Sequence, residues 1–190
     1  MKMATLFSVL PQLPKGFEYV PDFITQQEED QLIETVGAIA LHPMIFQGYE
    51  AKRKVASFGF DWSFEKRVLS KGKDMPHEFD WLIQKVGDRL SLSKPDFGEL
   101  LVTEYPTGSV INWHRDAPPF DIVVGISLLT DCTFRLRPHD KAKQGRNSII
   151  SFSAERRSLY VMKGASRSEW EHSIVPVRST RYSITLRTLR

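Results

Sequence analysis

Two stretches in the first half of the chain carry apolar residues at helical spacing. The first follows Thr25 and Glu28, which stand three residues apart as in the capping box that starts many helices. The apolar positions after this box are Leu32, Ile33, Val36 and Ile39. A second helix is predicted over 76–91, with Pro76 in its first turn and an apolar stripe made of Phe79, Leu82, Ile83, Val86 and Leu90. Both stripes are typical of core-facing helices and indicate no cofactor by themselves.

From residue 99 onward the pattern changes to short runs typical of β-strands, most of them separated by turn residues. The runs are 99–105, 108–114, 121–129, 132–137, 147–153, 157–163, 170–175 and 179–188. About eight short strands favour a double-sheet jelly roll or a barrel, and the two helices ahead of them make the fold class α+β. The segment 46–64, rich in aromatic and basic residues, is predicted to form one or two short strands.

Length and composition narrow the class of protein. A chain of 190 residues fits one domain, 1–190, with a helical and lid-like part, 1–98, and a jelly-roll core, 99–190. The content of 41% hydrophobic and 26% charged residues is that of a globular protein. A single cysteine, Cys132, excludes an internal disulfide framework and fits a reducing cytoplasm, where we place the protein. The net charge of +3 permits a polyanionic partner without requiring one.

Two motifs could together bind a metal. In NWHRD (112–116), His114 and Asp116 are two residues apart, so on a strand their side chains point to the same side. Alone, such a pair is more often structural than metal-binding. In WEHS (170–173), His172 lies on another predicted strand, where a single histidine is more often packed in a core. Two histidines and one carboxylate nevertheless make the facial triad that binds non-haem Fe(II) and leaves positions for a co-substrate and oxygen.

The last predicted strand contains RYSITLR (181–187), in which alternate residues form a polar face. This face comprises Arg181, Ser183, Thr185 and Arg187. It either meets water, which is the commoner arrangement, or lines the same interior as His172. An arginine in an interior needs an anion, and its guanidinium binds a carboxylate through two hydrogen bonds. A dicarboxylate such as 2-oxoglutarate would chelate iron at one end and pair with arginine at the other.

The order of these motifs resembles the AlkB-type family of Fe(II)- and 2-oxoglutarate-dependent dioxygenases. The order is Y-x-x-G (105–108), H-x-D (114–116), H (172) and R-x5-R (181–187), within a resemblance that covers about 40–190. The chain is most similar to compact bacterial members, through GYEAKRKVASFG (48–59), HRDAP (114–118) and RYSITLRTLR (181–190). The resemblance implies a double-stranded β-helix (jelly-roll) core, an Fe(II) centre, and 2-oxoglutarate and O2 as co-substrates.

The resemblance also implies roles for single residues. The catalytic iron ligands would be His114, Asp116 and His172. Arg181, assisted by Tyr105, would pair with the distal carboxylate of 2-oxoglutarate, and Arg187 would lie near its keto-acid end. Thr103 and Ser183 stand where the family often has asparagine, and because both keep a hydrogen-bonding group we include them in co-substrate binding.

For the substrate, the resemblance implies alkylated DNA or RNA, whose N-alkylated bases would be oxidatively demethylated with release of formaldehyde, succinate and CO2. A base taken out of its stack needs aromatic and phosphate contacts. Segment 46–64 offers such side chains, namely Phe46, Tyr49, Lys52, Arg53, Lys54, Phe58 and Trp62. We select Arg53, Phe58, Trp62 and Arg135 as substrate-binding residues. A basic turn in water beside core aromatics explains the segment equally well, and Arg135 could simply face water.

Two other functions fit the same residues. One is the same oxygenase chemistry on a modified tRNA, a protein side chain or a small molecule. The other is a non-catalytic nucleic-acid-binding jelly roll, although such a module would need neither an interior triad nor paired arginines. We expect an enzyme that acts as a monomer and does not bind membranes, since its longest apolar stretch, 122–129, is too short to span a bilayer.

Overall fold

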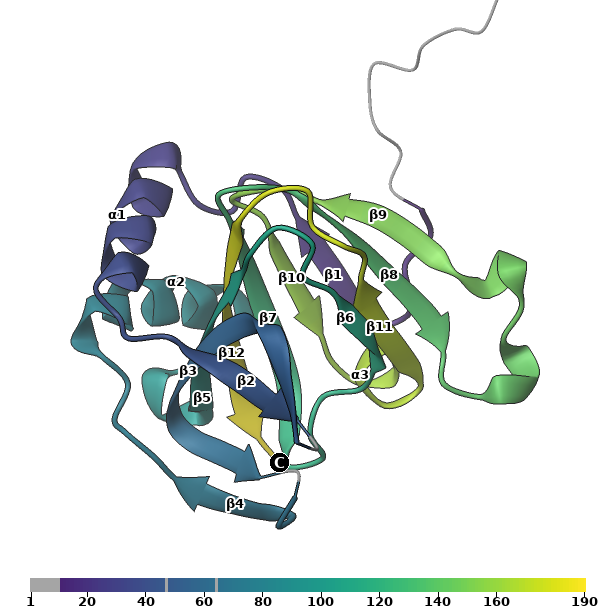
Figure 1. Ribbon diagram of the computed structural model, residues 1–190, viewed down its shortest axis with the longest axis horizontal. Coiled ribbons are helices and arrows are strands. Elements are labelled where there is room, and N and C mark those ends of the chain that lie inside the picture. Colours follow the sequence, from purple (N-terminus) through teal and green to yellow (C-terminus); the bar gives the residue numbers. More distant parts are fainter. Residues whose placement is uncertain (1–10, 47, 64) are drawn as a thin grey trace, which may run out of the picture.

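The computed structural model describes residues 11–46, 48–63 and 65–190, which form two packed β-sheets with the two longer helices on one outer side (Figure 1). The helices are α1 (Gln26–Gly37), α2 (Asp80–Leu90) and the short α3 (Ala165–Ser168). The large sheet contains β1 (Phe17–Val20), β2 (His42–Phe46), β3 (Tyr49–Ser63), β4 (Val68–Lys71), β5 (Phe97–Tyr105), β7 (Phe120–Leu128), β10 (Leu159–Met162) and β12 (Arg181–Leu189). The small sheet contains β6 (Ile111–His114), β8 (Cys132–Pro138), β9 (Ile150–Ala154) and β11 (Trp170–Ile174).

The strand order confirms the predicted jelly roll. The large sheet runs β1-β10-β7-β12-β5-β3-β2, with β4 paired to β3, and the small sheet runs β6-β11-β8-β9. Neighbouring strands are antiparallel, and from β5 to β12 the chain crosses between the two sheets at every connection except β8–β9, as in a double-stranded β-helix. Strands from before and after residue 98 share the large sheet, because β1 pairs with β10 and β3 pairs with β5.

Alternate residues of the large sheet face two different environments, which we call its outer and inner sides. The outer side packs against α1 and α2 in an apolar cluster that contains Leu100, Val102, Ile184 and Leu186 together with Leu32 and Leu82. The inner side faces the small sheet across a second apolar cluster, which includes Tyr105, Phe134, Tyr160 and Ile174. We also count as inner-side the residues of the small sheet and of the connecting loops that face this interior. The side-chain period of two therefore gives each strand one buried apolar face and one face that lines the interior of the jelly roll.

Both predicted helices are present. The Thr25 hydroxyl oxygen accepts a hydrogen bond from the Glu28 backbone N–H, and the Glu28 carboxylate accepts one from the Thr25 backbone N–H, so the capping box is confirmed. The second helix starts as a 3-10 turn, His77–Phe79, before α2 proper. Lys85 Nζ lies 2.7 Å from Glu28 Oε1 and ties the two helices together. In the described part of the chain, no helix has the length and apolar character needed to cross a membrane.

The segment 46–64 differs from its prediction. Instead of one or two short strands it contains the whole of β3, a 15-residue strand that pairs with β2, β5 and β4 along its length. Gly59 allows the change of partner, since its φ of +85° suits glycine and a Cβ there would collide with the Gly98 carbonyl. Strands β1 and β4, each of four residues, have no counterpart among the predicted runs.

Candidate metal centre

The three predicted metal ligands come together where β6 pairs with β11. His114 is the last residue of β6 and lies directly opposite His172, and the centres of their rings are 4.2 Å apart. Asp116 does not continue the strand as the two-residue spacing suggested, because β6 ends at His114 and the carboxylate comes from the loop that follows. His172 Nε2 is still 3.7 Å from Asp116 Oδ2, and ligand atoms of all three residues lie within 4.8 Å of one another.

The two imidazoles are held in the form that binds a metal. His114 Nδ1 donates to the Asn112 carbonyl oxygen at 2.9 Å, which leaves its Nε2 free to act as a ligand. His172 is buried and its ring stacks on Phe134 with centroids 5.5 Å apart. Burial, together with the neighbouring His114, lowers the pKa of His172 to about 3, so the imidazole is neutral.

The Asp116 carboxylate offers a metal one free oxygen. Its Oδ1 accepts a hydrogen bond from Arg187 Nη2 at 2.8 Å, whereas Oδ2 is buried without a hydrogen-bond partner among the described residues. Burial alone would raise the pKa of Asp116, but Arg187 and the two histidines outweigh it and hold the pKa below its usual range. An ionised carboxylate oxygen without a hydrogen-bond partner beside two imidazoles fits a divalent cation, which would complete the site.

Arg167, a buried residue of α3, holds the loop that carries Asp116. One terminal nitrogen of this arginine donates to the backbone carbonyl oxygens of Asp116, Ala117 and Phe120, at 3.0, 2.7 and 3.1 Å. The Ala117 carbonyl also accepts a hydrogen bond from the Phe120 N–H at 3.2 Å, so the loop is held both by its own backbone and by Arg167. Arg167 therefore sets the path of the loop and, with it, the position of the carboxylate.

The predicted co-substrate residues lie side by side on the inner side of the large sheet. On β12 and β5, Arg181 is opposite Tyr105 and Ser183 is opposite Thr103. Arg181 is buried, its Nε donates to Ser127 Oγ at 3.1 Å, and its guanidinium lies 4.9 Å from the centre of the Tyr105 ring. Its Nη1 has no hydrogen-bond partner in the part of the chain that the structure describes. A buried guanidinium with a free donor is suited to an anionic ligand.

Arg187 stands at the metal end of the same face. One of its terminal nitrogens pairs with Asp116, as described above, and the other pairs with Glu99 on β5. Sequence reasoning missed Glu99, Ser127 and Arg167. Glu99 shares the alternation of Thr103 and Tyr105 and could have been found from it, whereas nothing in the sequence near Arg167 marks that residue as a buried partner of the metal loop.

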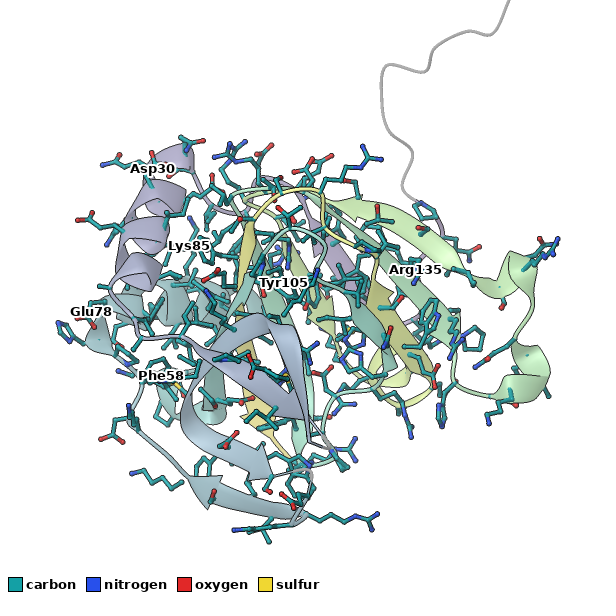
Figure 2. The ribbon with its side chains drawn as sticks, viewed as in Figure 1. Asp30, Phe58, Glu78, Lys85, Tyr105 and Arg135 are labelled. Carbon is teal, nitrogen blue, oxygen red and sulfur yellow. The ribbon has the colours of Figure 1, made fainter. Side chains whose placement is uncertain are left out.

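The predicted substrate-binding residues are dispersed. Arg53 lies on the inner side of β3 by its alternation with Val55, which pairs with Thr103, and it contacts Met44 Sδ. Phe58 packs against the cluster under the helices, on the outer side (Figure 2). This placement argues against a base contact for Phe58 and agrees with the alternative that aromatics of this segment belong to the core. Trp62 lies opposite Leu69 in the β3–β4 hairpin.

Arg135 occupies the face of the small sheet opposite to that of His172, since it lies opposite Ser173 on the neighbouring strand. It donates to Ser173 Oγ at 3.0 Å, and its guanidinium lies 4.8 Å from the centre of the Trp113 ring. The side chains of Phe46 and Tyr49 lie outside the described residues. A hollow of about 390 Å³ is lined by Pro138, His139, Asp140, Lys143, Ser168, Glu169 and Trp170, none of which belongs to the triad or to the polar face of β12.

Comparison with known proteins agrees with this geometry. The model of the 2OG-Fe(II) oxygenase superfamily matches residues 16–187 of the chain. The protein therefore belongs to the 2OG-Fe(II) oxygenases, a class defined by Fe(II), 2-oxoglutarate and O2. Within this class the resemblance to AlkB-type members is confirmed by the relatives that follow.

A mouse protein named tRNA (carboxymethyluridine(34)-5-O)-methyltransferase ALKBH8 is 27% identical over 175 residues, which are 88% of this chain and 25% of that protein. An Arabidopsis thaliana protein named Alkylated DNA repair protein ALKBH8 homolog is 26% identical, over 92% of this chain and 58% of that protein. The chain thus spans about a quarter of the mouse relative. Among solved structures, OsALKBH1 has a TM-score of 0.68 at 15% identity and covers 94% of this chain and 99% of its own.

The same fold appears in a prolyl hydroxylase from Trichoplax adhaerens in complex with a hypoxia inducible factor peptide fragment. That structure has a TM-score of 0.67 at 16% identity and covers 92% of this chain and 83% of its own. Likeness at this identity establishes the fold alone. The same fold thus occurs in a protein bound to a peptide, so the substrate of this chain has to be argued from its site and not from the sheet architecture.

Proposed function

We propose that this protein is an Fe(II)- and 2-oxoglutarate-dependent dioxygenase that demethylates N-alkylated bases in DNA or RNA. The observation that carries the proposal is the set of buried polar atoms without partners on the inner side. Asp116 Oδ2 and Arg181 Nη1 are both of this kind among the described residues, and they have opposite charge. A divalent cation would satisfy the first and the carboxylate of a co-substrate the second.

The predicted metal and co-substrate residues then have defined tasks. His114, Asp116 and His172 hold the metal through Nε2 atoms and the free Oδ2. Arg181 and Tyr105 bind the distal carboxylate of 2-oxoglutarate, with the hydroxyls of Thr103 and Ser183 beside them. Arg187 orients Asp116. When bound, the metal with 2-oxoglutarate and O2 supplies the oxidation of a substrate C–H bond and releases succinate and CO2. An oxidised N-methyl group leaves as formaldehyde.

The nucleic-acid substrate is supported by β3 and by the relatives. Lys52, Arg53 and Lys54 place three cations on a strand whose inner side continues the row of Thr103 and Tyr105. One relative is named an alkylated DNA repair protein homolog. Arg53 is the basic residue of this group that we assign to a phosphate, because its alternation directs it toward the inner side. A cytoplasmic location and a monomeric state stay predictions.

A turnover screen by mass spectrometry tests this function. Purified protein with Fe(II), ascorbate and 2-oxoglutarate is mixed with oligonucleotides that each carry one N-methylated base, and methyl loss and succinate are measured. Methyl loss with equal succinate is the expected result, and His172→Ala should give neither. Arg53→Ala should weaken oligonucleotide binding, while Lys54→Ala serves as the matched control, since Lys54 points to the other side of β3 and pairs with Glu104. Succinate without methyl loss would discard the substrate, and no succinate would discard the oxygenase.

A second substrate is favoured by a specific observation. The mouse, frog (Xenopus tropicalis) and macaque (Macaca fascicularis) relatives are all named as tRNA-modifying proteins, although the chain spans only about a quarter of each. The same oxygenase chemistry on a modified tRNA nucleoside is therefore the second candidate. Including bulk tRNA in the screen, followed by nucleoside analysis, separates it from base demethylation, because hydroxylation would add the mass of oxygen instead of removing a methyl group.

A further inference from the structure

Glu99 is a buried carboxylate on the inner side of the large sheet, and the roles assigned so far leave it unexplained. Its side chain is 4% exposed. Placing a charged group in such an environment is costly unless it is paired and hydrogen-bonded. Of the described residues, two contact it: Ser57 on β3 donates to one oxygen at 2.9 Å, and Arg187 pairs with the other.

Through Arg187, Glu99 connects to the metal ligand. The Arg187 guanidinium lies between two carboxylates, with one terminal nitrogen on Glu99 and the other on Asp116 Oδ1 at 2.8 Å. Because a guanidinium is planar and its donors have a fixed fork geometry, fixing one nitrogen also fixes where the other points. The hydrogen bond to Oδ1 orients the Asp116 carboxylate so that Oδ2 faces His172, 3.7 Å from its Nε2.

Two carboxylates share one cation in this chain of contacts. Asp116 and Glu99 each bind one of the two terminal nitrogens of the Arg187 guanidinium, so the position of the guanidinium depends on both carboxylates. Without Glu99, the Arg187 guanidinium would be free to rotate or to bind both oxygens of Asp116. Asp116 Oδ2 would then no longer be reserved for the metal.

We propose that Glu99 is a positioning residue of the metal site, which holds Arg187 so that Asp116 presents one oxygen to the metal. This inference rests on the proposed metal site and extends it to a residue on a different strand. Hydrogen bonds that orient ligands from outside the coordination sphere typically change metal affinity by about 10–100-fold when removed. Ser57 supports Glu99 from β3 and therefore has a smaller effect of the same sign.

The test measures binding of Co(II), whose visible absorption reports the ligand geometry directly and needs no turnover. We expect Glu99→Gln to raise the Co(II) dissociation constant about 10–100-fold and to change the band shape. The matched control is Glu29→Gln, which alters another buried carboxylate paired with an arginine, Arg156, far along the chain from the triad. This control should lower the melting temperature while Co(II) affinity and spectrum stay unchanged.

A double variant separates positioning from a simple loss of charge. If Glu99 acts through Arg187, then Glu99→Gln in an Arg187→Met background should weaken Co(II) binding no further than Arg187→Met alone. The proposal would be overturned if Glu99→Gln weakened Co(II) binding as much in the Arg187→Met background as in the wild-type protein. It would also be overturned if the folded Glu99→Gln variant kept the wild-type Co(II) affinity and spectrum. Ser57→Ala, which leaves both ion pairs in place, keeps the test decisive if Glu99→Gln fails to fold. It should weaken Co(II) binding by less than about tenfold. Unchanged Co(II) binding in Ser57→Ala would count against the proposal.

Co(II) binding tests the metal site and the role of Glu99 separately. Wild-type protein that is folded but does not bind Co(II) would remove the metal site and the role of Glu99 with it. Wild-type protein that binds Co(II) and is indifferent to Glu99→Gln would leave the metal site in place and remove the role of Glu99 alone. Neither result depends on which nucleic acid is the substrate.

Discussion

The two sides of the large sheet are made from the same strands but hold opposite kinds of chemistry. On β12, Ile184 and Leu186 face outward and pack under the helices, while Arg181 and Arg187 face inward. The outer side needs no ligand, since its apolar side chains are buried against each other. The inner side is incomplete, since Arg181 and Asp116 keep buried atoms without protein partners in the described chain. One side stabilises the fold, and the other is built for ligands at some cost to stability.

The largest expected effect is on the inner side. His172→Ala removes a metal ligand and should reduce turnover below detection, by more than the roughly 100-fold that outer-sphere changes cause. Because the buried imidazole is neutral, its loss leaves no charge unpaired, and the metal-free variant should remain folded. Succinate release and thermal melting measure the two quantities, and retained turnover would remove His172 from the metal site.

The next effect belongs to the outer side. Leu186→Ala removes a fully buried side chain and should lower the free energy of unfolding by about 2–5 kcal/mol. Turnover per folded molecule should not change, because Leu186 points away from the triad. Urea unfolding and succinate release on the soluble fraction check both statements. A loss of turnover per folded molecule would show that the two sides are less independent than their packing indicates.

A third substitution should change function and stability in opposite directions. Arg181→Met removes the partner proposed for 2-oxoglutarate and should raise its KM about 10–100-fold, since a charged hydrogen bond contributes about 1.5–3 kcal/mol. In the unliganded protein the same change removes a buried guanidinium whose Nη1 has no partner, and it also removes the Nε hydrogen bond to Ser127. Because replacing a buried charge by an apolar side chain is often neutral or stabilising, stability should stay equal or rise. Steady-state kinetics and melting curves test this. An unchanged KM would place the co-substrate elsewhere.

The smallest effect concerns the helix layer. Burial alone would raise the pKa of Glu28, but hydrogen bonds from Lys85 and Thr25 outweigh it and leave the pKa lowered. The stability that Glu28 contributes is therefore present above the pKa of about 4.3 of a free glutamate and is lost as the pH falls through the lowered value. Glu28→Gln should cost about 1 kcal/mol at pH 7 and progressively less below pH 4. Equal costs at both pH values would contradict the ionic origin.

The catalytic half was predictable because its residues alternate in short, separated runs. The polar face of β12 follows from strand periodicity, and the order of motifs indicated that His114 and His172 share one site, although not that their strands pair. The segment around β3 was harder, since its basic and aromatic residues alternate weakly and its pairing partners change at Gly59. Arg167 could not be found at all, because its role depends on three carbonyls in a loop that is remote in sequence.

The pairing of β6 with β11 also determines when the site can come into being. His114 and His172 are separated by most of the catalytic half of the chain and meet only after the small sheet has closed. Such non-local contacts form late, because the intervening chain must first be ordered. During synthesis, a nascent chain that ends before β11 holds two of the three ligands and no complete centre. Binding of the metal would therefore report that β6 and β11 have paired.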